Sequence, residues 1–158
     1  MAGPRTKRGR WALALSAAGG LLLVASAFSS WTEPAHVSWP SYTDGVPDFI
    51  PHPSDALFRV GSGLLGASAL VLVLLARRGV SHRLSWLLLP LLGLGGIALG
   101  LEGLIAVEHH RGFGSMIANN MTLTGFRHGP LNYAELVGAS LLCLAPLAAI
   151  QASRSTGR

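Results

Sequence analysis

The chain has 158 residues, of which half are hydrophobic and only 12% are charged, and its mean hydropathy is +0.47. These proportions exclude an ordinary soluble domain, in which about 25% of the residues are charged. The net charge of +5 does not indicate a nucleic-acid partner, because the basic residues are sorted along the chain and are not gathered into one surface run.

Four apolar stretches are long enough to cross a bilayer. A helix needs about 20 apolar residues for this, because each residue advances it by about 1.5 Å through a hydrocarbon core roughly 30 Å thick. Helices also satisfy their own backbone hydrogen bonds in lipid. The sequence therefore predicts an all-α integral membrane protein with transmembrane helices at residues 11–28, 57–76, 84–107 and 131–150.

The basic residues predict the orientation of these helices. Nine of the twelve fall in residues 1–10, 77–83 and 151–158, while all seven acids fall in residues 29–56 and 108–130 or at the span ends beside them. By the positive-inside rule, the N-terminus, the short loop and the C-terminal tail are cytoplasmic. The two longer loops are then extracytoplasmic, and both are expected to be ordered.

The first span also resembles a secretory signal peptide. It has a basic start, an apolar run and the small residues Ala25, Ser26 and Ala27 near its end. The run is longer than the 7 to 15 or so apolar residues of a typical signal peptide. Retention as a signal anchor is therefore favoured, and the alternative is cleavage after residue 27.

The two outer loops differ in their predicted structure. Five prolines in residues 29–56 argue against a helix or a central strand and favour turns and extended pieces, lying on the membrane or against a partner. In the second loop, residues 115–123 are predicted to form a short interfacial helix.

Glycines predict a close helix crossing in the third span. Four of them recur at spacings of three and four residues, which places them on one helical face, and one pair forms a GxxxG motif. They are Gly93, Gly96, Gly100 and Gly103.

Three ionisable residues lie inside or at the ends of the predicted spans: Glu102, Glu135 and Arg59. A carboxylate within the membrane is costly unless it is paired, hydrated or protonated. Glu102 projects roughly opposite the glycine face. For Arg59, a snorkelling headgroup contact is favoured, and the alternative is pairing with Glu135 or Glu102.

Histidines and acids on the outer side suggest a possible zinc or copper site. The candidate ligands are His109, His128, His52 and Glu108. Their spacing matches no metal motif, so solvated loop histidines are favoured and no cofactor is predicted. No histidine falls within a span, which disfavours a haem between helices. The single cysteine, Cys143, excludes an intrachain disulfide.

These features favour a non-catalytic accessory or scaffold subunit of a larger membrane complex. Its expected partners are the lipid bilayer and other membrane subunits or further copies of itself, and the arginine-rich composition suggests a bacterial inner membrane. One alternative is an extracytoplasmic-face metal-binding protein or metal-dependent enzyme that uses the outer histidines and acids. A second is a transporter or channel protomer with Glu102 and Glu135 on its path.

Overall fold

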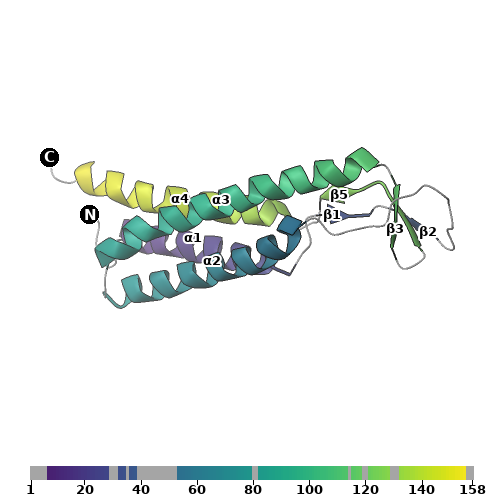
Figure 1. Cartoon of the computed structure of the whole chain (residues 1–158). Coiled ribbons are helices and arrows are strands. Elements are labelled where there is room, and N and C mark those ends of the chain that lie inside the picture. The colour runs from purple at the N-terminus through teal and green to yellow at the C-terminus, as the bar shows by residue number, and fades with distance from the viewer. Residues whose placement is uncertain are drawn as a thin grey trace.

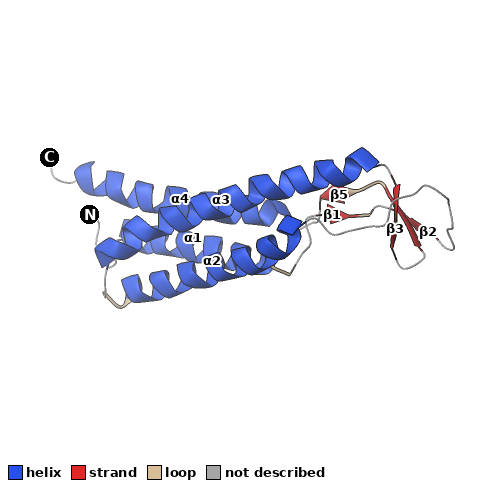
Figure 2. Ribbon diagram, viewed as in Figure 1, coloured by secondary structure: helices blue, strands red, loops and turns tan. Residues whose placement is uncertain are grey.

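The structure is a computed structural model that describes residues 7–28, 32–34, 36–38, 53–79, 82–113, 115–118, 121–128 and 132–155. Within these residues, four helices form a bundle and short strands lie beyond one end of it (Figure 1, Figure 2). The helices are α1 (Lys7–Ser26), α2 (Pro53–Arg77), α3 (His82–Phe113) and α4 (Asn132–Ser155).

Each helix packs against its two neighbours in a closed ring. α1 contacts α2 and α4, and α3 contacts the same two helices from the other side. Successive helices run in opposite directions, which is the up-and-down arrangement of a simple bundle. One end of the bundle holds the start of α1, the end of α4 and the connection from α2 to α3, and we call it the terminal end (Figure 1). The strands lie beyond the opposite end, which we call the cap end.

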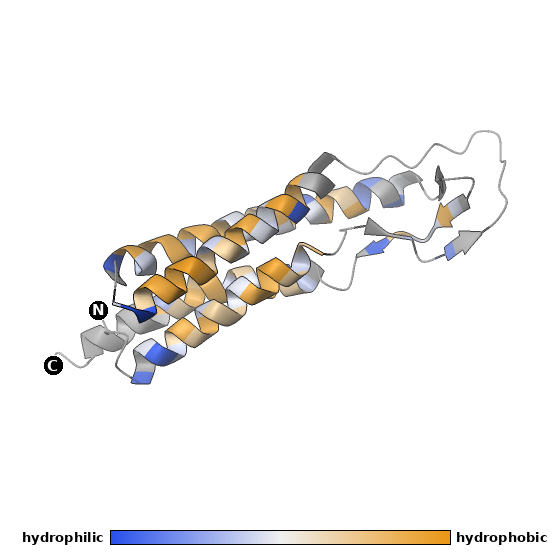
Figure 3. Ribbon diagram, turned by 90° about the horizontal axis from the view of Figure 1, so that it is seen from below, coloured by the Kyte–Doolittle hydropathy of each residue, from blue (hydrophilic) through white to orange (hydrophobic). Residues whose placement is uncertain are grey.

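Three of the four helices are long and apolar enough to span a membrane. Their apolar segments are Gly9–Ser26, Leu57–Arg77 and Arg83–His109. Most of the bundle consists of hydrophobic residues, and hydrophilic residues lie near its two ends and in the strands (Figure 3). In α4 the corresponding segment is shorter, Tyr133–Leu147. The prediction of four helices is confirmed, and spanning length is met by the first three among the described residues.

The surface of the bundle carries many large apolar side chains. The side chains of Leu64, Leu74, Leu91 and Leu94 are more than half exposed. An apolar surface this extensive is unusual in a soluble monomer but suits contact with lipid tails. The core draws on all four helices, and its fully or almost fully buried members include Leu23, Ala69, Trp86, Leu89 and Leu142.

The helices extend beyond the apolar stretches from which they were predicted. α2 begins at Pro53, where proline suits the first helical turn, and α3 continues to Phe113, past the predicted end at residue 107. Hydropathy marks the part of a helix that lies in lipid, whereas backbone hydrogen bonding continues into polar turns. Glu108 and His109 therefore lie on α3 and not in an outer loop.

The strands from the two loops pair with each other. β1 (Thr32–Glu33) and β2 (His36–Ser38) run antiparallel to β5 (Arg127–His128) and β4 (Met121–Thr124), respectively. A single register runs through both pairs, with Thr32 opposite His128 and Ser38 opposite Thr122. The two loops thus form one interrupted antiparallel ribbon, which we call the cap.

The prediction of an interfacial helix at residues 115–123 is wrong, because residues 115–118 and 121–124 form two strands. β3 (Ser115–Ala118) pairs with β4 as a hairpin, from Ser115 opposite Thr124 to Ala118 opposite Met121. The β-branched residues Ile117, Thr122 and Thr124 favour strands. The two residues between the strands are asparagines, a residue type common in tight hairpins, although they lie outside the described residues.

Glycines set the closest helix contacts. A Cβ added at Gly93 would lie 2.7 Å from the carbonyl oxygen of Ala139 on α4, and one added at Gly96 would lie 2.9 Å from the Ala139 Cβ. A Cβ at Gly100 would collide with the side chain of Leu136. Gly103, the last residue of the predicted glycine face, is buried as well. The face therefore lies along α4.

Replacement of Gly93 by alanine should destabilise the bundle by about 1–3 kcal/mol, because the new methyl group meets backbone that cannot move independently of α4. Gly63→Ala is the matched control, since its Cβ would make an ordinary 3.5 Å contact with the Ala27 Cβ. Thermal unfolding in detergent, followed by circular dichroism, measures both. Equal midpoints for the two variants would contradict the assigned α3–α4 contact.

Candidate functional site

Among the described residues, the most buried ionisable side chain belongs to Glu135, near the start of α4. It is completely buried, and the Ser62 hydroxyl on α2 donates a hydrogen bond of 2.7 Å to its Oε1. α2 and α4 occupy opposite corners of the ring of helices. This hydrogen bond therefore crosses the interior of the bundle, and it ties together two helices that are not neighbours.

The Glu135 carboxyl group is only partly satisfied. Its Oε2 is buried and has no hydrogen-bond partner among the described residues, and the same holds for the hydroxyl of Ser16 on α1. A buried acceptor without a partner costs about 1–3 kcal/mol. Ser26, which is also buried, donates instead to the Leu23 carbonyl oxygen of its own helix at 2.8 Å. The interior thus holds polar groups with unused hydrogen-bonding capacity.

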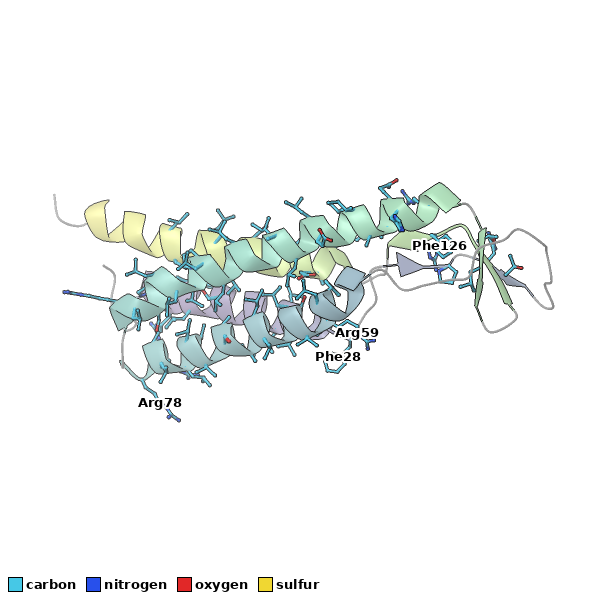
Figure 4. All side chains as sticks on the ribbon, viewed as in Figure 1. Phe28, Arg59, Arg78 and Phe126 are labelled. Carbon is cyan, nitrogen blue, oxygen red and sulfur yellow. The ribbon has the colours of Figure 1, made fainter. Side chains whose placement is uncertain are left out.

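The structure does not pair Arg59 with either predicted acid. Its side chain is exposed, and its Nε donates to the Ala27 carbonyl oxygen at 3.4 Å, near Phe28 on the outside of the bundle (Figure 4). Ser62, three residues further along α2, meets Glu135 instead. Three residues turn a helix by about 300°, so the two side chains leave α2 only about 60° apart, yet Ser62 is buried and Arg59 is exposed.

Glu102 lies on α3 with a partly exposed side chain, and it makes no hydrogen bond or ion pair with another described residue. Nearby positions of α3 show which way it faces: a Cβ on Gly95 would contact Leu65, and one on Gly61 would contact Leu99, so this side of α3 meets α2. Glu102 follows Leu99 by one helical turn. It therefore lies on the α2 side, away from the glycine face.

A second polar cluster joins α3 to the cap. The Nε of Arg111 donates to the Phe126 carbonyl oxygen at 3.1 Å, and its Nη1 lies 2.8 Å from the Glu108 carboxylate. Leu123 on β4 and Phe126, between β4 and β5, are buried at 8% and 4% exposure. The ion pair is exposed, contributes little by itself and lies within α3, so of these two interactions the bond to the Phe126 carbonyl oxygen is the one that links the helix to the cap.

The structure describes the side chains of only two of the four predicted metal ligands. His52 lies outside the described residues, and the side chain of His128, on β5, is not described. Glu108 is engaged with Arg111, and His109 is exposed on α3. No group of three histidine, cysteine or acidic side chains that could hold a metal occurs in the described part of the chain. The metal site stays an untested prediction.

Several interacting residues carry weak signals in the sequence. Ser62 lies between two glycines and looks like one more small residue of a packing face. Gly19 and Gly20 are adjacent, so they show no helical spacing, yet a Cβ at Gly19 would lie 2.6 Å from the Gly138 carbonyl oxygen of α4. Gly20 and Gly66 bring α1 and α2 together in the same way. The partners in each pair are distant in sequence, and periodicity within one helix does not reveal them.

Comparison with protein-family models, curated proteins and solved structures finds no match.

Ser62→Ala should destabilise the bundle by about 1–3 kcal/mol, because it leaves the buried Glu135 carboxyl group without its hydrogen-bond donor. Ser68→Ala, at an exposed position on the same helix, is the control and should change stability by less than about 0.5 kcal/mol. Unfolding in mixed detergent micelles measures the difference. If the Ser62 variant is as stable as the Ser68 variant, the hydrogen bond makes no net contribution.

Arg111→Gln should loosen the cap without unfolding the bundle. Loss of a hydrogen bond from a charged donor costs about 1.5 kcal/mol or more, so amide exchange in β4 and β5 should become roughly tenfold faster. Glu108→Gln should have little effect, because the ion pair is exposed. Hydrogen exchange read by mass spectrometry tests this, with Arg127→Gln as an exposed control. Acceleration that is equal in the helices would point to general destabilisation instead.

Proposed function

We propose that this protein is a non-catalytic accessory or scaffold subunit of a larger complex in a bacterial inner membrane. In this proposal all four helices lie in the membrane, with residues 1–10, 77–83 and 151–158 in the cytoplasm. The cap projects on the opposite, extracytoplasmic side and is the principal surface for a protein partner.

Charge supports this orientation. Among the described residues, Lys7, Arg10 and Arg83 belong to helix starts at the terminal end, while Glu33 and Glu108 belong to the cap and to the part of α3 beside it. Basic residues favour the cytoplasmic face of a bacterial membrane. The chain termini would then be inside.

The cap is the observation that carries the proposal. Both loops contribute strands to a single ribbon, and that ribbon is hydrogen-bonded to the extension of α3 through Arg111. In the sheet formed by β2, β4 and β3, the outer strands are β2 and β3. Outer strands offer backbone groups to a partner that adds a strand or loop. An ordered projection of this kind supports a docking role better than that of a simple helix connection.

The bundle supports a scaffold role as well. α1 contacts both of its neighbours through backbone, at Gly19 and Gly20, and α3 contacts α4 along its glycine face. Without a strong hydrophobic drive between helices in lipid, such close packing is the main source of association. A tightly packed bundle holds the cap in a fixed position relative to the membrane.

Site-specific photo-crosslinking in membranes tests this function. A benzophenone side chain placed at His36, which is exposed on β2, should give one discrete adduct with a protein partner. The same probe at Leu91, exposed within the apolar segment of α3, serves as a lipid-facing control. Absence of any protein adduct from His36 and Arg127, together with migration as a lone chain on native gels, would contradict the proposal.

A transporter or channel protomer is the second candidate, and Glu135 is the observation that favours it. A buried carboxyl group with one unpartnered oxygen is a common feature of ion and proton pathways in membranes. Ion or proton flux in proteoliposomes that is abolished by Glu135→Gln and unaffected by Glu108→Gln would support this candidate. It would do so whether or not the cap gives an adduct.

A further inference from the structure

A cavity opens between α1 and α2 at the terminal end of the bundle, far from Glu135 and from the cap. Its volume is about 610 Å³. The lining residues of α1 recur at helical spacing on a single face of that helix. The others come from the last two turns of α2 and from the turn that follows it. The lining consists of Arg10, Leu13, Ala14, Ala17, Val73, Arg77, Arg78 and Gly79.

Side-chain size accounts for the cavity. Further along the bundle, α1 and α2 touch backbone to backbone at Gly20 and Gly66. Towards the terminal end, α1 presents the short side chains of Ala14 and Ala17, which do not fill the space in front of Val73. A volume of this size falls within the range of about 300–1,000 Å³ typical of small-molecule sites.

The charges around the cavity all have one sign. Arg10, Arg77 and Arg78 are exposed, permanently charged guanidinium groups, and no carboxylate is among the described residues of the lining. The Arg78 side chain extends outward from the turn that follows α2 (Figure 4). Like charges held close together repel each other, and a bound anion removes that repulsion.

The mouth of the cavity is basic, whereas its walls are apolar. Leu13 and Val73 are each 7% exposed, and they lie between the arginines and the middle of the bundle. Trp11, beside Arg10, is 64% exposed, as expected of a residue that sits at the level of lipid headgroups. A free inorganic anion would use the basic mouth but would leave the apolar walls uncovered. A phospholipid would use both.

We infer that this cavity binds one anionic glycerophospholipid, with the phosphate at Arg10 and Arg77 and an acyl chain against Leu13, Ala17 and Val73. Guanidinium groups bind phosphate oxygens through paired, charge-assisted hydrogen bonds. Basic pockets between transmembrane helices are known to take anionic lipid headgroups. The inference needs only that the terminal end lies at a membrane surface, and it does not depend on the proposed partner at the cap.

Native mass spectrometry of the full chain in a nonionic detergent tests the inference. Phosphatidylglycerol should bind as a single equivalent, at least tenfold more tightly than phosphatidylcholine with the same acyl chains. Arg10→Gln and Arg77→Gln should each weaken it about fivefold, which corresponds to the usual contribution of one basic residue near an anionic lipid. Arg83→Gln is the matched control, because Arg83 is exposed at the same end but does not line the cavity.

A second variant separates a lipid from a free anion. Ala17→Leu fills the apolar part and leaves every charge in place, so it should weaken phosphatidylglycerol severalfold without changing the thermal midpoint. Millimolar inorganic phosphate should not displace the lipid. Equal binding of the two lipids, an equal loss in Arg83→Gln, no loss in Ala17→Leu, or displacement by phosphate would each overturn the inference.

Discussion

The close contact between α1 and α4 at Gly19 and Gly138 is the constraint on which the bundle depends. A Cβ at either glycine would lie within 2.7 Å of the other's carbonyl oxygen, so the two backbones touch. Individual van der Waals contacts are weak, but many of them form when two helices approach this closely. Gly20, the next residue, makes the corresponding contact with α2. α1 therefore holds two neighbours at once, and the ring closes around it.

Close packing explains why a single hydrogen bond can span the interior. Ser62 and Glu135 come from opposite corners of the ring, and a short serine side chain reaches the carboxyl group only because the helices are near each other. The contact lies towards the cap end, where α2 and α4 begin. One polar link at that level adds directionality to an interior that is packed mainly with apolar side chains.

The two ends of the bundle differ in chemistry, and this contrast underlies the proposed protein partner at the cap and the proposed lipid at the terminal end. At the cap end, backbone pairing and the Arg111 hydrogen bond turn two connecting loops into one ordered element. At the terminal end, short alanine side chains open a space that basic residues surround. We propose a protein partner at the first end and an anionic lipid at the second, because the same bundle offers a different surface at each end.

The sequence by itself determined the number and approximate position of the helices, because bilayer thickness fixes the length of an apolar stretch. It also determined the sorting of charge between the two ends. Only the tertiary structure decided where the helices end, since α3 continues through polar residues to Phe113. The hairpin at Ser115–Thr124 was missed because β3 gains its partner from backbone pairing that hydropathy does not report. Ser62 became a partner of Glu135, 73 residues away, because interactions between distant segments depend on how the helices pack and not on spacing within any one of them.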